Sequence, residues 1–89
     1  MITSRKQELM TILQEEAAEV IQAVSKCFRF GETERNTKDL ETEIGDFLGV
    51  LKLLVEEGYL DQTGQALMKH AEAKIKKLDK YMTFKKVIS

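Results

Sequence analysis

The sequence contains no proline, so no residue in it forbids a long helix. Its single cysteine, Cys27, cannot form an internal disulfide, which makes a reducing compartment such as the cytoplasm the simplest expectation. No apolar run approaches the ~20 residues of a membrane helix, and the amino terminus lacks a signal-peptide core. We therefore expect a cytoplasmic protein that does not insert into a membrane.

Several common catalytic motifs are also missing. The sequence has no Gly-x-x-x-x-Gly-Lys phosphate loop, no dinucleotide fingerprint, no Cys-x-x-Cys and no plausible Ser-His-Asp set. Its single histidine, His70, excludes the paired Glu-x-x-His motifs of di-iron helical bundles. The 14 basic and 15 acidic residues nearly cancel, so we expect no direct binding to nucleic acid.

The 89 residues suffice for one domain, 1–89, because a second could not bury a core of its own. Apolar residues recur at helical spacing in three segments, which predict helices over about 4–29, 37–57 and 61–81. Expected start signals are Ser4 with Gln7, then Asn36 or Thr37, then Asp61, while Gly31 and Gly58 are expected to follow helix ends.

These elements predict an all-α antiparallel bundle of three helices joined by short connections. Three short helices enclose a thin core, so we expect oligomerisation to complete a four-helix-type core. Residues 31–36 are polar and are expected to form a loop, and 83–89 are expected to be a frayed tail or a partner-docking segment.

Four acidic residues fall where an apolar surface is expected. At 100° per residue, Glu16 points between Ile12 and Val20, and Glu19 lies at the edge of the same stripe. The second predicted helix repeats this pattern with an i, i+3 pair, Glu43 and Asp46. An ionised carboxylate taken out of water loses several kcal/mol unless another group compensates its charge.

Protonation, buried basic side chains or a divalent cation would each relieve that cost. Protonating all four acids near neutral pH is implausible, because a raised pKa for one cannot discharge the rest. Most lysines of the third helix project away from its apolar stripe and are expected to be a solvated face, or else to attract an anionic ligand. Carboxylate donors favour Mg²⁺, or Mn²⁺ as a substitute, over zinc.

The two acidic pairs also carry a resemblance to a family. Glu15-Glu16-Ala17-Ala18-Glu19, followed by Glu43-Ile44-Gly45-Asp46, resembles the EExxE…ExxD signature of MazG-type all-α nucleoside triphosphate pyrophosphohydrolases. The likeness covers roughly residues 9–57. It implies Mg²⁺-dependent hydrolysis of an NTP or dNTP to the monophosphate and pyrophosphate, commonly by a homodimer or homotetramer whose subunits share a pocket.

By motif matching, the metal ligands would be Glu16, Glu19, Glu43 and Asp46. Glu15 and Glu16 are the expected catalytic residues, with Glu15 orienting or activating water or supporting the ligands. Lys26 is the first choice for holding the outer phosphates, because it shares a helical edge with Glu19; the further candidates are Arg29, Lys52, Lys74 and Lys77.

The sequence departs from the family pattern in base recognition. Several relatives carry an aromatic or amide residue four positions after the motif aspartate, where this chain has Val50, and tryptophan is absent. Two alternatives to an enzyme stay open: a non-catalytic module that binds nucleotide or metal, and a helical protein that only oligomerises.

Overall fold

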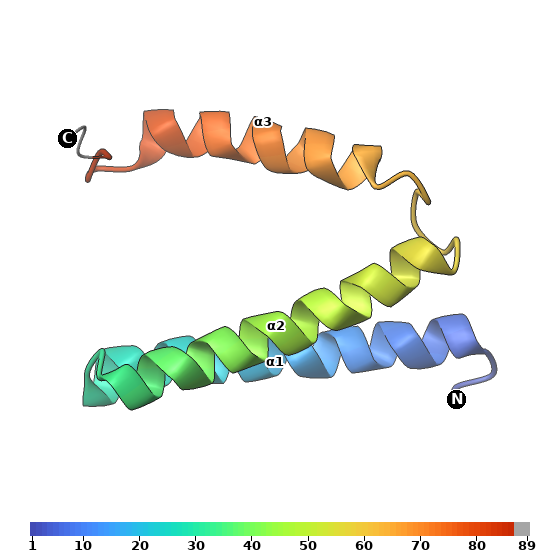
Figure 1. Ribbon diagram of the computed structural model, residues 1–89, viewed down its shortest axis with the longest axis horizontal. Helices are drawn as coiled ribbons and strands as arrows, with labels where there is room; N and C mark the ends of the chain where they lie inside the picture. The colour runs from blue at the N-terminus through green and yellow to red at the C-terminus, as the bar shows by residue number, and fades with distance from the viewer. Residues whose placement is uncertain (87–89) are drawn as a thin grey trace.

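A computed structural model, which describes residues 1–86, contains three helices and no strand within that range (Figure 1). Helix α1 spans Arg5–Phe30, α2 spans Glu34–Glu56 and α3 spans Gln65–Tyr81. Helices α1 and α2 lie antiparallel and in contact along their length, whereas α3 extends as a separate arm. The predicted all-α fold with three main helices is confirmed.

Helix α1 begins and ends with the predicted signals. The Ser4 hydroxyl accepts a hydrogen bond from the Gln7 amide at 3.1 Å, while the Gln7 side chain accepts one from the Thr3 amide at 2.7 Å. Two otherwise unpaired amides are thereby satisfied. Gly31 adopts a positive φ of 102° and donates its N–H to the Cys27 carbonyl, which ends the helix.

Helix α2 begins three residues earlier than predicted. The cap is Thr33, whose hydroxyl accepts from the Asn36 amide at 3.1 Å, so the predicted cap Asn36 lies inside the first turn. The Asn36 side chain instead donates to the Gly31 carbonyl at 2.8 Å. The predicted loop over 31–36 is therefore only Gly31 to Thr33, which holds α1 and α2 close together.

Helix α3 begins later than predicted, because the Asp61 side chain closes a turn. Its carboxylate accepts from the amides of Thr63 and Ala66 at 3.2 and 3.1 Å and from the Thr63 hydroxyl, and the helix starts only at Gln65. Gly64, the actual cap, has a φ of 72°.

The tail after α3 is only partly described, and of the predicted segment 83–89, residues 87–89 lie outside the described residues. The Lys85 ammonium donates to the Asp79 carbonyl, which folds the described part back toward α3.

One chain buries very little. In the described part of the chain, the buried hydrophobic residues are Leu9, Ala23 and Leu54, all in the hairpin of α1 and α2. Helix α3 buries none and has no contact with α1 or α2. The radius of gyration is 16.0 Å, against about 12 Å for a compact domain of this length.

Candidate metal centre

Acidic side chains from both helices of the hairpin meet near its middle. Glu16 of α1 and Glu43 and Asp46 of α2 each place one carboxylate oxygen so that all three oxygens lie within 4.8 Å of one another. We call these three residues the acid cluster. Glu16 and Glu43 are half-buried and Asp46 is exposed. The short turn at residues 31–33 produces this meeting, because it sets the middle of α1 against the middle of α2.

The acid cluster carries uncompensated negative charge. Its half-buried position raises the pKa of Glu43 above the usual value, and the neighbouring charges of Glu19, Asp46, Glu16 and Asp39 raise it further. Within residues 1–86, the ion pairs join Arg5 to Glu57, Lys38 to Glu34 and Lys52 to Glu56. None of these pairs includes a residue of the acid cluster, so no lysine or arginine of the described chain neutralises it by direct contact.

The donor set and its spacing fit a small divalent cation. Mg²⁺ binds oxygen ligands at 2.0–2.1 Å, so two opposite ligands are about 4.2 Å apart. Adjacent ligands are about 2.9 Å apart. The three carboxylate oxygens, which lie within 4.8 Å of one another, would therefore have to move closer together around a bound ion. Three carboxylates also leave coordination positions for water or phosphate oxygens, as is usual for Mg²⁺ sites that act on nucleotides.

A small hollow lies beside the acid cluster. Its volume is about 260 Å³, below the ~300–1,000 Å³ typical of small-molecule sites. We call it the acidic hollow; both helices of the hairpin line it, through Glu19, Gln22, Ala23, Lys26, Asp39 and Glu43. Glu43 belongs to both features, so the hollow and the acid cluster form one continuous site.

Glu19 takes a different place from the other three predicted ligands. It is exposed and stands outside the group of three, lining the acidic hollow instead. The sequence reasoning did not identify Gln22 or Asp39 as parts of the site. The spacing of the residues in the sequence could have identified both. Gln22 follows Glu19 by three residues and Asp39 precedes Glu43 by four, so each pair lies on one face of its helix.

The other candidate residues fall into different surroundings. Lys26 lines the acidic hollow together with acidic side chains of both helices. Glu15 is exposed and outside the acid cluster. The Arg29 guanidinium lies 5.0 Å above the Phe30 ring, and the Lys52 ammonium lies 3.9 Å from Glu56. Two further candidates belong to α3, which does not contact the hairpin; they are Lys74 and Lys77.

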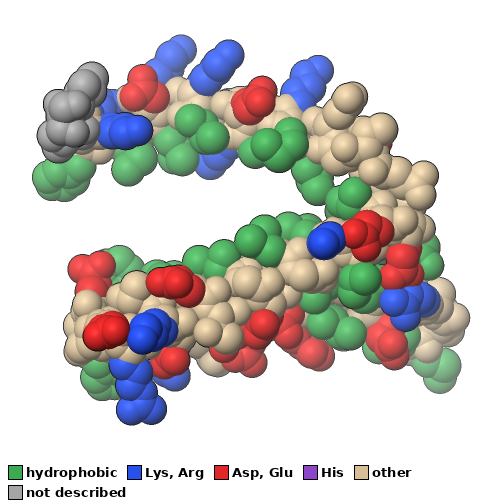
Figure 2. Space-filling view, in the orientation of Figure 1, with side chains coloured by type: hydrophobic (Ala, Val, Ile, Leu, Met, Phe, Trp, Pro, Cys, Tyr) green, Lys and Arg blue, Asp and Glu red, His purple; other side chains and the backbone are tan. Residues whose placement is uncertain are grey.

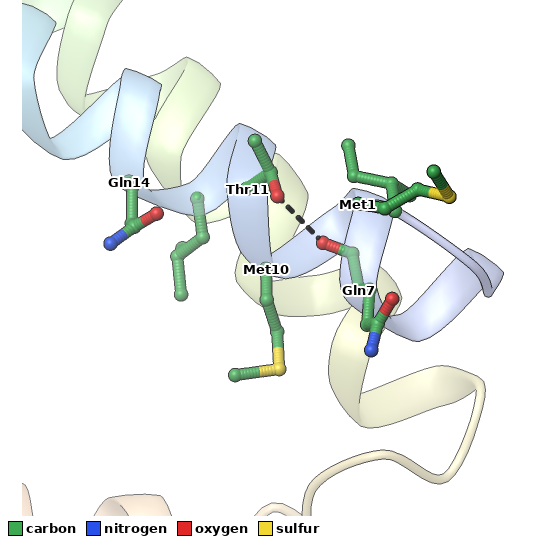
Figure 3. A pocket seen from close by; sticks show the side chains of 7 residues that line it. Met1, Gln7, Met10, Thr11 and Gln14 are labelled. Atoms are coloured by element: carbon green, nitrogen blue, oxygen red, sulfur yellow. Dashed lines mark hydrogen bonds between the residues drawn. The ribbon is translucent and has the colours of Figure 1, made fainter.

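A second hollow lies at the amino-terminal end of α1, where methionine and glutamine side chains surround it (Figure 3). Its lining contains no charged side chain and consists of Met1, Ile2, Gln7, Met10, Thr11, Leu13 and Gln14. It offers no carboxylate to hold a metal ion, so it is not part of the candidate metal centre.

Comparison with known proteins gives the family. No similar curated protein and no similar solved structure was found. No helix in the described range is both long and apolar enough to cross a bilayer. Residues 4–83, most of the chain, match the MazG nucleotide pyrophosphohydrolase domain. The match includes all three helices and the whole acid cluster, and the chain therefore belongs to the MazG nucleotide pyrophosphohydrolase family.

Proposed function

We propose that this protein is a Mg²⁺-dependent hydrolase that converts an NTP or dNTP to the nucleoside monophosphate and pyrophosphate. The observation that carries the proposal is the acid cluster: three carboxylate oxygens within 4.8 Å of one another, with no neutralising side chain bound to them in the described chain. Mn²⁺, which takes the same oxygen ligands, is a plausible substitute.

Glu16, Glu43 and Asp46 hold the metal in this proposal, with Glu19 able to join from the side of the acidic hollow. Bound there, Mg²⁺ would neutralise charge on the phosphates. A water oxygen bonds to phosphorus as the bond between the α- and β-phosphates breaks, leaving a monophosphate and pyrophosphate. The attacking water loses a proton, and a nearby carboxylate accepts it. In this proposal Glu15 and Glu16 are the catalytic residues: Glu16, within the acid cluster, accepts the proton, and the exposed Glu15 orients the water or supports the ligands.

Lys26 is the proposed contact for the outer phosphates. It lines the acidic hollow with Glu19 and Glu43, beside the oxygens that would hold the metal. An ammonium there would bind phosphate oxygens and hold the triphosphate of the substrate in line for attack by water. The base and sugar find no assigned contact in a single chain. Self-association into a dimer or tetramer is therefore part of the proposal.

A cytoplasmic location is also part of the proposal, and it rests on the single cysteine of the sequence.

The test is pyrophosphate release from a panel of NTPs and dNTPs, with and without Mg²⁺. The wild-type protein should release pyrophosphate at a constant rate only when the metal is present. Glu43→Gln should lose at least about 100-fold in kcat/KM, because the substitution removes a ligand and its charge. Glu41→Gln is the matched control, since Glu41 is exposed on the same helix and outside the acid cluster.

Two results would contradict the enzyme. Metal-dependent nucleotide binding without turnover would leave a binding module. A protein that neither binds nor hydrolyses nucleotides would leave a helical assembly protein. Equal activity of Glu43→Gln and Glu41→Gln would refute the role of the acid cluster even if the protein is active.

A further inference from the structure

The acidic hollow adjoins a larger hollow at the start of α2. We call this one the polar hollow; its volume is about 600 Å³, and it is lined by Thr33, Glu34, Arg35, Lys38 and Asp39. Both acidic and basic side chains gather at this end of the hairpin, at the left of Figure 2. Asp39 is the residue that lines both hollows, so the two meet at its side chain.

The two hollows together have room for a nucleotide. The acidic hollow alone, about 260 Å³, is below the ~300–1,000 Å³ typical of small-molecule sites, whereas the polar hollow is within that range. Glu43 connects the acid cluster to the acidic hollow, and Asp39 connects the acidic hollow to the polar hollow. A continuous surface therefore runs from the candidate metal centre along α2 toward the turn, with space for a nucleoside beyond the metal-bound phosphates.

Asp39 adds a negative charge beside the place of the phosphates. It is exposed and belongs to none of the ion pairs within residues 1–86. Burial and the charges of acidic neighbours, Asp39 among them, raise the pKa of Glu43, so Asp39 lies close enough to the acid cluster to act on it. A carboxylate there repels a phosphate. Asp39 is therefore suited to a part of the substrate that carries no negative charge.

The chemistry of a carboxylate and its distance from the metal centre indicate which part that is. A carboxylate accepts hydrogen bonds and donates none. The donors of a nucleoside are the hydroxyls of its sugar and the N–H groups of its base. Asp39 precedes Glu43 by four residues and so lies about 6 Å from it along α2. The sugar is bonded directly to the α-phosphate and lies within that reach, whereas the base lies farther away.

Resting on the proposed function, we infer that Asp39 binds the 2′- and 3′-hydroxyls of the sugar and that the substrate is therefore a ribonucleoside triphosphate. The two hydroxyls donate to the carboxylate, and a deoxyribose offers only one of them. An acidic residue binds the ribose of dinucleotides in the same way. The phosphates follow the α1 wall of the acidic hollow to Lys26, while the sugar follows the α2 wall to Asp39 and the base lies over the polar hollow.

The contact is tested by the ratio of kcat/KM for an NTP to that for the dNTP of the same base. The wild type should favour the NTP about 10- to 100-fold, the effect of one hydrogen bond to a charged group. Asp39→Ala should lower kcat/KM for the NTP by at least the same factor and bring the ratio close to one. Glu41→Ala is the matched control and should keep the wild-type ratio, since Glu41 is exposed on α2 and lies outside both hollows.

A substrate without the hydroxyls distinguishes the contact from a general effect of the charge. With the 2′,3′-dideoxynucleotide of the same base, Asp39→Ala should not lower kcat/KM, because neither hydroxyl is there to be bound. Asp39→Asn, which keeps the shape of the side chain, should give a ratio between those of the wild type and Asp39→Ala. An equal loss with all three substrates, or a wild-type preference for the dNTP, would overturn the contact.

The outcomes separate this inference from the proposed function. A wild-type protein that releases pyrophosphate equally well from the NTP and the dNTP refutes the sugar contact and leaves the hydrolase. Nucleotide binding without turnover refutes the hydrolase, and the same ratios of Kd, measured by titration calorimetry, then decide the sugar contact. A protein that binds no nucleotide refutes both.

Discussion

Magnesium should stabilise this protein through the acid cluster, and the dependence on concentration can be worked out. A ligand that binds only the folded state adds RT ln(1 + [L]/Kd) to the free energy of unfolding. Above Kd, each tenfold rise in free Mg²⁺ therefore adds about 1.4 kcal/mol for one site per chain. For chains of 60–100 residues, 1 kcal/mol corresponds to about 4–8 °C. The expected slope is thus about 6–11 °C per tenfold rise in Mg²⁺.

The assay is a thermal melt by circular dichroism, from about 0.1 to about 30 mM MgCl₂, with NaCl added to keep the ionic strength constant. Constant ionic strength matters because simple screening also relieves repulsion among acids. Glu43→Gln should flatten the slope by removing one of three ligand oxygens, while Glu41→Gln should keep it. A wild-type melting temperature that is the same in MgCl₂ and in NaCl of equal ionic strength would refute the metal centre.

Two further predictions concern the metal-free protein. The pKa of Glu43 is raised in the folded state, so the ionisation of this carboxyl opposes folding as the pH rises above 4.5. Glu43→Gln should therefore melt near the wild-type temperature below pH 4.5 and at a higher temperature than the wild type at pH 7. A difference in melting temperature that does not change with pH would contradict this. Leu54 is 2% exposed, so Leu54→Ala should cost about 2–5 kcal/mol in urea unfolding, whereas Leu60→Ala, at a position 37% exposed, should cost less.

The sequence predicted the helices well, because their signals are local. Ser4 and Gly31 bound α1 as expected, through hydrogen bonds within a few residues. The errors at the starts of α2 and α3 arose where two capping residues compete. Thr33 took the cap expected at Asn36, and Asp61 closed a turn with Thr63 while also accepting from the Ala66 amide, so that α3 starts only at Gln65. Either of two neighbouring capping side chains can accept a hydrogen bond from a free amide at the helix start, and contacts with the rest of the protein determine which of them does so.

The site was predictable only in part. An acid on an apolar stripe can be found by projection, and Glu16 and Glu43 do lie half-buried between the two helices. Positions three apart on a helix differ by about 60° in direction, so Glu16 and Glu19 cannot both point at the same spot on α2. Which of them does depends on how the helices cross. What covers α3 was likewise beyond the sequence, because an apolar stripe shows that a face needs a partner without showing which one.

The three-residue turn between α1 and α2 restricts how this protein can vary in length. Adding one residue within either helix, between the turn and the acids, would rotate one acid by about 100° relative to its counterpart. Glu16 would then no longer face Glu43, although every residue of the site would still be present. Natural insertions and deletions should therefore be rare in the helical segments 16–30 and 34–46, which connect the acids to the turn.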